Sequence, residues 1–393
     1  MKYGLNVTVA GCGTVGAGVV GMLTSRDLTR AAGCEVKLKY VVDIKDVDLP
    51  QGVELTSDFD RALEHTDILV ETIGGTGIAY AYTKKALERG VSVTTSNKAL
   101  VAAHGDELKR IAAENNAWYL YEASVCGGMP ALRPLGTCLA GNKIESISGI
   151  VNGSTNYLIT RMLTGISFSA ALGEAKSQGF VEANPDDDIL GCDARRKLAI
   201  LASTAFNSKL SDDAFIPAKG IEKLTMEDVV SFRSVGMAVK LIAHAKMTDN
   251  GWTGWVHPAL VSKNSPLYGV DGVFNGLLIK GDYVDEVMFY GRGAGMKPTA
   301  SAIVGDIIEI ARSLDRPFAS THASQPAFVS PDGLMAQVAC RVESGCKEPD
   351  IPVERCFELD DCRLYITKED RLGKLLDNPA FGSNGIGIPL ILV

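Results

Sequence analysis

The sequence predicts an α/β protein with a Rossmann-type doubly wound parallel sheet and a second α+β domain. Two observations predict the first part: a glycine-rich turn, GCGTVG, directly follows a short apolar strand, and strands then alternate with helices up to residue 122. After Pro130 this alternation stops, and strands and helices mix without a regular order. That change predicts a second domain of the α+β class.

The composition is typical of a globular protein and argues against several classes. Of the 393 residues, 46% are hydrophobic and 22% are charged, which allows two or three domains with separate cores. The net charge of -8, without a basic stripe, argues against binding to nucleic acid. No apolar run reaches the ~18 residues of a membrane span, and the N-terminus leads straight into a strand without the features of a secretory signal. We therefore expect no membrane association and a cytoplasmic location.

The nine cysteines form no C-x-x-C pair, which favours reduced thiols over a disulfide framework. Four of them cluster near the end of the chain at Cys340, Cys346, Cys356 and Cys362. Their gaps differ from the usual pairs of a zinc site, so a zinc site there stays open without being favoured.

The glycine-rich turn stands between the strand Asn6–Ala10 and an apolar helix. In this context G-x-G-x-x-G predicts a dinucleotide site. The first glycine permits the tight turn, the second lets the backbone approach a pyrophosphate, and the third lets the helix pack on the strand. Helix N–H groups would then bind the anion. We expect contacts to the dinucleotide from Gly11, Gly13, Thr14, Val15 and Gly16.

The next strand, Val36–Val42, ends in Asp43, where a Rossmann domain places the acid that binds the ribose 2'-hydroxyl. A carboxylate at this position favours NAD. Lys45 lies two residues further on and could pair with a 2'-phosphate, so the sequence leaves NADP open.

Three more strands complete the predicted parallel sheet. We expect them at 67–72, 92–95 and 118–122, with helices at 59–64, 79–89 and 102–115 between them. Ligands of such sheets bind beyond the carboxyl ends of the strands. Gly74, Lys98 and Glu122 follow or end these strands and are candidates for that edge.

In the second part, the strand 144–151 leads into NGSTNY, a turn with amide and hydroxyl residues that can cap the following helix, 158–163. We expect a long helix at 229–247 and then extended segments at 254–261, 272–280 and 285–291. The turn GRGAG, which contains Gly293, precedes a helix at 299–313. Such a turn can approach a cofactor or simply bend the chain.

A helix from Asp193 onward contains the most informative pair. Asp193 and Lys197 are four residues apart and so share one face. The pair can be an ordinary surface ion pair, with the preceding aspartates, 186–188, only stabilising a helix start. It can also be a carboxylate that orients a functional amine.

Taken together, these segments resemble homoserine dehydrogenases. The resemblance covers about 310 residues through seven ordered blocks: GCGTVG at 11–16, ETIGG at 71–75, TSNKALVA at 95–102, YEASVCGGMP at 121–130, GIVNGSTNY at 149–157, GFVEANPDDDILGCDARRKL at 179–198 and GRGAGMKPTASAIVGD at 291–306. It implies reversible, NAD- or NADP-dependent hydride transfer between L-homoserine and L-aspartate 4-semialdehyde, in the aspartate-family route to threonine and methionine.

The resemblance also implies residue roles. It places the catalytic lysines at Lys98 and Lys197 and the substrate-binding acids at Glu182 and Asp193. Reduction of an aldehyde by hydride produces an alkoxide that needs a proton, and an ammonium can stabilise that charge and deliver the proton. We assign this role to Lys197, oriented by Asp193, with Lys98 as a second amine at the same oxygen.

Three further expectations come from the family. A Na+ or K+ ion would bind, largely through backbone carbonyls, at Glu122, Val125, Gly127 and Met129. Members are usually homodimers that associate through the second domain. Many also end in an ACT regulatory module, of which only 369–373 and 385–388 are vaguely similar here, so we expect no complete ACT domain.

The expected domains are therefore an NAD(P)-binding domain at 1–131, a substrate-binding, catalytic and dimerisation domain at 132–296, a helix returning to the nucleotide domain at 297–316, and an extension at 317–393. The sequence departs from the family pattern just before Lys197. The double alanine that usually precedes this lysine is replaced here by Ala194-Arg195-Arg196. Two other functions are considered: an aldehyde dehydrogenase with Cys126 as its nucleophile, and a dinucleotide sensor without catalytic activity.

Overall fold

The computed structural model describes residues 4–181, 184–210, 213–314, 325–382 and 385–393. The chain divides into two compact units, and each is built from several segments. The first contains Met1–Ala140, Ala199–Asp212 and Arg292–Gln325, and the second contains Gly141–Leu198, Asp213–Gly291 and Pro326–Val393.

The first unit contains a six-stranded sheet with the order β3-β2-β1-β4-β5-β6. Its strands are β1 (Gly4–Ala10), β2 (Glu35–Val42), β3 (Glu54–Thr56), β4 (Ile68–Glu71), β5 (Ser92–Thr95) and β6 (Tyr119–Leu120). All neighbouring strands are parallel. The strand order reverses direction at β1, which confirms the doubly wound Rossmann fold and places a ligand crevice at the carboxyl ends of β1 and β4.

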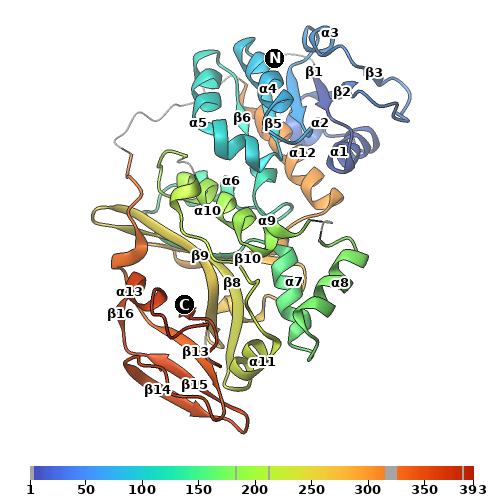
Figure 1. The fold of residues 1–393 in the computed structure, drawn as a ribbon. Helices are drawn as coiled ribbons and strands as arrows, with labels where there is room; N and C mark the ends of the chain where they lie inside the picture. Colours follow the sequence, from blue (N-terminus) through green and yellow to red (C-terminus); the bar gives the residue numbers. More distant parts are fainter. Residues whose placement is uncertain (1–3, 182–183, 211–212, 315–324, 383–384) are drawn as a thin grey trace. The chain divides into compact units, whose positions relative to one another are not determined.

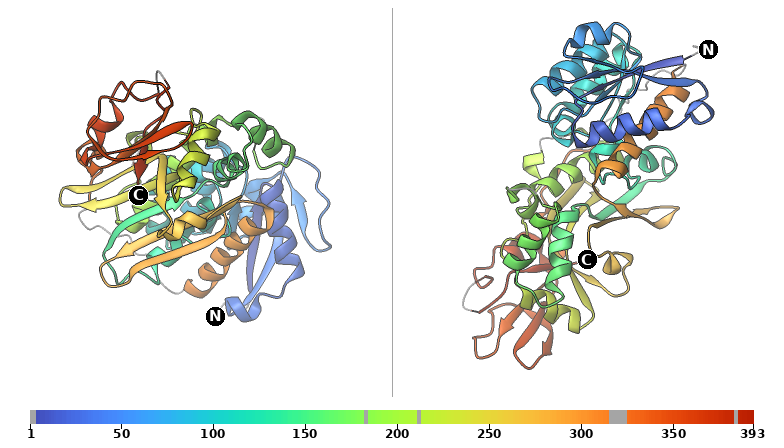
Figure 2. Two further views of the ribbon diagram at one scale, coloured as in Figure 1. Left: turned by 90° about the horizontal axis from the view of Figure 1, so that it is seen from below. Right: turned by 90° about the vertical axis from the view of Figure 1, so that its right-hand side faces the viewer.

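Helices cover both faces of this sheet (Figures 1 and 2). The helices of the first unit are α1 (Thr14–Ser25), α2 (Thr29–Ala32), α3 (Phe59–Leu63), α4 (Ile78–Glu88), α5 (Lys98–Glu114), α6 (Leu132–Gly136) and α12 (Met296–Ser313), with a 3-10 turn, η1, at Glu122–Ser124. Apolar residues of α1 and α12 form one core with β1, although α12 is distant in sequence. Helices α4 and α5 pack together on the opposite face (Figure 1).

The second unit contains a nine-stranded sheet with the order β11-β10-β7-β8-β9-β17-β13-β15-β14. The strands are β7 (Ile144–Ile150), β8 (Met237–Thr248), β9 (Gly251–Ser262), β10 (Phe274–Gly281), β11 (Asp285–Arg292), β13 (Val338–Glu343), β14 (Val353–Glu358), β15 (Cys362–Thr367) and β17 (Leu390–Leu392). A small second sheet pairs β12 (Met335–Ala336) with β16 (Asp370–Arg371).

The helices of the second unit are α7 (Gly153–Met162), α8 (Phe168–Ser177), α9 (Asp186–Ile189), α10 (Cys192–Ala205, shared between the units), α11 (Met226–Ser234) and α13 (Leu372–Leu376). Short 3-10 turns occur at Asp213–Phe215, Pro266–Gly269 and Pro331–Gly333. Helices α7 and α11 pack on the sheet, and α8 packs on α7 (Figure 1). This mixture confirms the α+β class of the second part.

The long helix expected at 229–247 is wrong. The helix α11 ends at Ser234, Gly236 adopts a left-handed φ of 81°, and β8 follows. Strand β8 lies between β7 and β9 and is buried along most of its length. A strand buried on both faces has a continuous apolar sequence, which periodicity cannot distinguish from a buried helix.

The residues after 325 extend the large sheet rather than forming a separate layer. Strand β15 lies between β13 and β14 and is antiparallel to both, and β17 inserts between β13 and β9. Across the described part of the chain, no helix has the length and apolar character needed to cross a membrane.

Candidate functional site

The glycine-rich turn joins β1 to α1, and the geometry at each of its three glycines explains why a side chain is absent there. Gly11 has a φ of 89°, and a Cβ atom there would lie 2.8 Å from the backbone of Thr72 and Ile73. A Cβ atom at Gly16 would lie 2.0 Å from the carbonyl oxygen of Gly11. Gly13, in contrast, is exposed and has open space around it. The turn therefore leaves room for a ligand at its second glycine and at the start of α1.

Asp43 lies at the end of β2 and contacts this turn. Its Oδ2 accepts a hydrogen bond from the Cys12 N–H at 2.7 Å, and its Oδ1 accepts from the Lys45 N–H at 3.0 Å. These hydrogen bonds from backbone N–H groups lower the pKa of Asp43, and the bond from Cys12 has the largest effect. The carboxylate is therefore charged at neutral pH and is held beside the glycine turn, as a ribose-binding acid would be.

The loop after β4 is held by a buried carboxylate. Glu71 is fully buried, its Oε1 accepts from the N–H groups of Ile73 and Gly74 at 2.8 and 3.2 Å, and its Oε2 accepts from Thr95 Oγ1 at 2.5 Å. Gly74 is exposed at the tip, with a left-handed φ of 85°. The bonds of Glu71 thus tie the carboxyl ends of β4 and β5 together and present the Gly74 backbone at the ligand edge.

Lys98 is the first residue of α5, four residues earlier than the expected start of that helix. Asn97 caps the helix by accepting from the Leu100 N–H, and its amide donates to the Gly75 carbonyl at 2.6 Å. The half-buried Lys98 therefore follows β5 at the same edge of the sheet as Gly74.

In the second unit, Asp193 and Lys197 form a buried ion pair at the start of α10. The distance between Lys197 Nζ and Asp193 Oδ2 is 2.6 Å, and only 12% and 3% of their side chains are exposed. The Lys197 ammonium also donates to the Val151 carbonyl at 2.9 Å. A solvated surface pair is thereby excluded, because both charges are withdrawn from water and hydrogen-bonded.

Two residues that the sequence did not single out complete this cluster. The amide nitrogen of Asn152 donates to Asp193 Oδ2 at 2.8 Å and to Asp188 Oδ1 at 2.7 Å. Asp188 belongs to the aspartate run, 186–188, that the sequence analysis considered as stabilising only a helix start. In the structure, burial raises the pKa of Asp188 and the Asn152 hydrogen bond opposes that effect. The motif NGSTNY was the available signal, but its asparagine was interpreted only as a cap.

The expected cation-binding residues lie in one buried loop of the first unit. Residues Cys126 and Gly127 have left-handed φ angles of 57° and 53°, so the loop turns sharply. Within the described residues, no donor bonds to the carbonyl oxygens of Val125, Gly127 or Met129. Buried carbonyls normally have partners, and a small cation is a suitable one.

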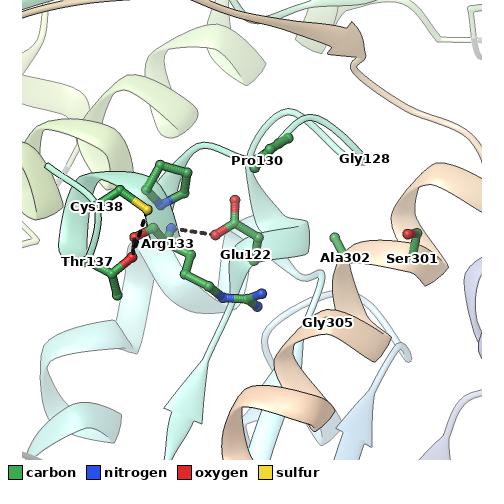
Figure 3. A pocket seen from close by; sticks show the side chains of 10 residues that line it. Glu122, Gly128, Pro130, Arg133, Thr137, Cys138, Ser301, Ala302 and Gly305 are labelled. Atoms are coloured by element: carbon green, nitrogen blue, oxygen red, sulfur yellow. Dashed lines mark hydrogen bonds between the residues drawn. The ribbon is translucent and has the colours of Figure 1, made fainter. Parts of the chain in front are cut away.

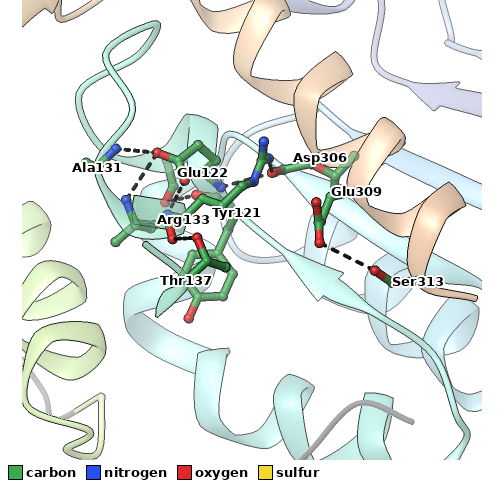
Figure 4. A network of polar contacts seen from close by, with 11 residues as sticks. Tyr121, Glu122, Ala131, Arg133, Thr137, Asp306, Glu309 and Ser313 are labelled. Atoms are coloured by element: carbon green, nitrogen blue, oxygen red, sulfur yellow. Dashed lines mark hydrogen bonds and ion pairs between the residues drawn. The ribbon is translucent and has the colours of Figure 1, made fainter. Parts of the chain in front are cut away.

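Glu122 begins this loop, and its carboxylate is fully engaged (Figure 4). Oε1 accepts from the N–H groups of Ala131 and Leu132, and Oε2 accepts from that of Arg133. The Glu122 N–H in turn donates to Asp306, which also forms an ion pair with the Arg133 guanidinium. The Glu122 carboxylate is therefore occupied by backbone donors, while its carbonyl accepts one bond from the Val125 N–H at 3.4 Å.

This network carries more buried negative than positive charge once Asp306 is ionised, above pH about 7. Asp306 is 1% exposed, and burial raises its pKa to about 7, with Glu122 adding to the effect and Arg133 opposing it. Two carboxylates share one guanidinium among the described residues that contact them. A cation in the neighbouring carbonyl loop would balance the excess charge, so the residues present fit a monovalent ion.

A cavity of about 250 Å³ opens between α6 and α12 next to this network (Figure 3). Arg133, Cys138 and Ser301 line it together with Glu122. The turn before α12 also approaches the loop closely: a Cβ atom at Gly127 would lie 2.5 Å from the Gly293 carbonyl oxygen. Gly293 thus supports the carbonyl loop, and whether it also contacts a cofactor stays a prediction.

Two family models match the chain. The one described as "Homoserine dehydrogenase, NAD binding domain" matches residues 11–122, and the one described as "Homoserine dehydrogenase" matches residues 130–308. A homoserine dehydrogenase of Neisseria gonorrhoeae is 36% identical over 342 residues, which cover 84% of this chain and 78% of the relative. The chain belongs to the homoserine dehydrogenase family.

Other homoserine dehydrogenases agree with this result. That of Helicobacter pylori is 39% identical over 79% of this chain and 75% of its own. The solved structure from Thiobacillus denitrificans has a TM-score of 0.90 at 29% identity and covers 99% of this chain and 98% of that one. A hyperthermophilic archaeal homoserine dehydrogenase in complex with NADPH has a TM-score of 0.66 at 28% identity and covers 78% and 97%.

Membership of the homoserine dehydrogenase family makes this chain an NAD(P)-dependent oxidoreductase and sets two alternatives aside. The aldehyde dehydrogenase alternative needs an accessible thiol, but Cys126 is fully buried. The sensor alternative is set aside because the matching family models and relatives are described as homoserine dehydrogenases. Of the residues that the family resemblance singled out, Glu182 lies outside the described residues. The extra arginine Arg196 pairs with Asp187 in the second unit.

The four cysteines near the end of the chain do not share one site. Cys340 and Cys362 are buried, whereas Cys356 is exposed. In the described part of the chain, no group of three or more His, Cys, Asp or Glu side chains could hold a metal ion.

Proposed function

We propose that this chain catalyses the reversible, NAD(P)-dependent reduction of L-aspartate 4-semialdehyde to L-homoserine, with Lys197 as the proton donor and acceptor. Family membership supports the reaction, and one observation supports the residue: a lysine ammonium buried on α10 and held by Asp193 and the Val151 carbonyl. Because it is held by a carboxylate and a carbonyl, this ammonium has a defined direction, as a proton donor to an alkoxide requires.

The substrate's groups fit the charges of the cluster. Asp188 and Asp193 together with Lys197 leave one excess negative charge, which suits the α-ammonium of L-homoserine. We assign Asp193 and Glu182 to that ammonium, and Lys98 to the reacting oxygen as a second amine. When bound, the nicotinamide cofactor supplies or accepts the hydride. The glycine turn and Asp43 would hold its pyrophosphate and ribose, and Gly74, Lys98 and Gly293 would contact it nearby.

The test is a comparison of initial rates with L-homoserine and either NAD or NADP, for wild type, Lys197→Ala and Lys263→Ala. Lys197→Ala should lower kcat by about 100-fold or more, as for loss of a general acid and base, while dinucleotide affinity stays unchanged. Lys263 is exposed in the same unit and is the matched control. A Lys197→Ala variant with a rate within threefold of wild type would contradict the proposed role, and Lys98→Ala and Glu182→Gln test the other two assignments.

We also propose that Na+ or K+ binds the carbonyls of Glu122, Val125, Gly127 and Met129. The carbonyls of Val125, Gly127 and Met129, which accept from no donor among the described residues, support this ion, as does the excess negative charge of the network once Asp306 is ionised. Activity and thermal midpoint measured in NaCl, KCl and choline chloride at equal ionic strength test it. Choline is too large for the loop, so equal values in all three salts would contradict the site.

The remaining proposals rest on the family resemblance. We propose a homodimer formed through the second domain, with domains at 1–131, 132–296, 297–316 and 317–393 carrying the roles expected from the sequence, and a cytoplasmic location. Light scattering during size-exclusion chromatography tests the dimer, because a mass near the 41.7 kDa of one chain would contradict it.

A further inference from the structure

Asn152 stands at the junction of β7 and α7 and caps that helix. Its side-chain Oδ1 accepts from the Thr155 N–H at 2.8 Å and from Thr155 Oγ1 at 3.0 Å. An N-cap needs only such an acceptor oxygen, which serine or aspartate supplies equally well. The amide nitrogen of Asn152 is therefore not required for the cap, and its contacts need a separate explanation.

That nitrogen lies between two carboxylates. It donates to Asp188 Oδ1 on α9 and to Asp193 Oδ2 on α10, at 2.7 and 2.8 Å. Asn152 and Asp193 are 4% and 2% exposed and Asp188 is half-buried, so the contact to Asp193 is shielded from water and the contact to Asp188 partly so. Two carboxylates that bind the same amide nitrogen lie close together, and their charges repel strongly where the dielectric is low. A neutral donor shared between them reduces this repulsion.

The orientation of the amide follows from its partners. If the Asn152 amide were rotated by 180°, its oxygen would face two carboxylates and its NH2 group would face the Thr155 N–H. Both changes replace hydrogen bonds with repulsion. The cap on one side thus locks the donor on the other side toward Asp188 and Asp193.

The residue before Asn152 contacts the other member of the ion pair. The Val151 carbonyl accepts from Lys197 Nζ at 2.9 Å, while Asn152 donates to the same Asp193 oxygen that pairs with Lys197. Two consecutive residues at the end of β7 therefore position both the ammonium and its carboxylate. Because they join β7, which lies inside the sheet, directly to the first turn of α7, they have little freedom to move.

We propose that Asn152 is a positioning residue for proton transfer by Lys197: its amide holds Asp193 in the rotamer that pairs with Lys197 and keeps Asp188 beside it as a second carboxylate. This inference rests on the proposed function, since it assumes that Lys197 moves the proton.

The inference predicts a change in the pH profile. Among the described residues, the titratable and polar groups that act on Asp188 are Asn152 and Ser154 near the start of α7 and Asp193 and Lys197 on α10. Burial raises the pKa of Asp188, and the Asn152 hydrogen bond opposes that rise. Without the amide donor, the pKa of Asp188 rises further, so the acid limb of the rate profile should move to higher pH.

The experiment compares wild type with Asn152→Ser and Asn152→Asp, and with Ser167→Ala as the control. Both substitutions at 152 keep an N-cap oxygen and remove the amide donor. Ser167 caps α8 in the same unit through the Ala170 N–H, so its loss weakens a cap without touching the cluster. Thermal midpoint, dinucleotide affinity, and kcat and KM for L-homoserine are measured from pH 5 to 10.

For Asn152→Ser we expect a folded protein with unchanged dinucleotide affinity, a kcat lowered by about 100-fold, and an acid limb shifted upward. Asn152→Asp should lose more, because it adds a third carboxylate. Ser167→Ala should keep the wild-type kcat and pH profile.

Three results would overturn the inference. One is an Asn152→Ser variant with kcat within threefold of wild type and an unchanged acid limb. Another is failure of both variants at 152 to fold, which would make the residue a structural cap. The third is a wild-type protein without turnover of L-homoserine, which would overturn the proposed function together with this inference, whereas the first two leave that function intact.

Discussion

At the scale of single residues, burial decides the meaning of the Asp193 and Lys197 pair. Four-residue spacing on a helix occurs equally in solvated ion pairs, which contribute roughly 0.3 to 0.5 kcal/mol. Here the side chains are 3% and 12% exposed, and withdrawing two charges from water costs several kcal/mol unless other groups bond to them. Asn152 and Val151 supply those bonds. The buried pair is therefore stabilised by the surrounding hydrogen bonds from Asn152 and to Val151 rather than by its own Coulomb attraction alone.

Asp43 carries the first residue-scale prediction. Its charged carboxylate beside the glycine turn would repel the 2'-phosphate of NADP. Asp43→Asn keeps an acceptor for the Cys12 N–H but removes the charge, so the ratio of kcat/KM for NADP to that for NAD should rise about tenfold or more. Initial rates with both cofactors measure it. Asp46→Asn, at an exposed position in the same loop, should leave the ratio unchanged, and an unchanged ratio in both variants would argue against a ribose contact at Asp43.

The second prediction at this scale concerns Asp306 and the dependence of the free energy of unfolding on pH. Its folded pKa of about 7 lies above the ~3.9 of an unfolded aspartate, so between these values the folded state holds a proton that the unfolded state lacks. The free energy of unfolding should therefore fall as pH rises from 4 to 7, by at most about 1.4 kcal/mol per pH unit from this group.

Asp306→Asn removes that contribution. Denaturant unfolding at pH 5 and pH 7.5, in a buffer free of Na+ and K+, should show a smaller loss of stability on raising the pH than in wild type. Asp285→Asn, at an exposed position, is the control. Equal pH slopes for Asp306→Asn and wild type would mean that Asp306 is ionised throughout this range.

At the scale of elements, the turn between β1 and α1 separates two kinds of glycine. Gly16→Ala would place a Cβ atom 2.0 Å from the Gly11 carbonyl oxygen, so the helix must move away from the strand. We expect Gly16→Ala to lower the thermal midpoint and to weaken NAD(P) binding by at least about tenfold, as measured by fluorescence titration.

Gly21→Ala, five residues later on the same helix, is the matched control. A Cβ atom there meets nothing within 4 Å, and alanine in a helix interior is favoured over glycine by about 0.5 to 1 kcal/mol. This variant should bind the dinucleotide normally and be slightly more stable. Normal dinucleotide affinity in Gly16→Ala would contradict the close packing described for the turn.

At the scale of the whole molecule, the strand β17 closes the large sheet of the second unit. It is parallel to β9 and antiparallel to β13, and Ile391 in it is 2% exposed in a core shared with α13. Strands β13, β14 and β15 therefore join the rest of the sheet through a three-residue segment.

Ile391→Ala tests this arrangement. Removing the buried side chain should lower the free energy of unfolding by about 2 to 5 kcal/mol, measured with urea. Val393→Ala, two residues later and 39% exposed, should change it by less than about 0.5 kcal/mol. Equal effects of the two substitutions would show that β17 does not close the sheet.

The sequence by itself determined the Rossmann sheet, the dinucleotide turn and the family. These features depend on local patterns: glycines at fixed spacing, apolar strands alternating with amphipathic helices, and a carboxylate at a strand end. Interactions between residues close in sequence are sufficient to specify such features. At Gly11 a positive φ, and at Gly16 the lack of space for a Cβ atom, constrain the chain directly.

Only the tertiary structure decided the rest. Burial distinguished the Asp193–Lys197 pair from a surface ion pair, and α9 and α10 together gave Asn152, at the start of α7, two carboxylate partners. The segment 237–248 became a strand because β7 and β9 bond to both of its edges, and the residues of β17 found their place beside β9, more than 120 positions earlier. Each of these outcomes depends on groups distant in sequence that remove water from one another, and no local pattern records which groups those are.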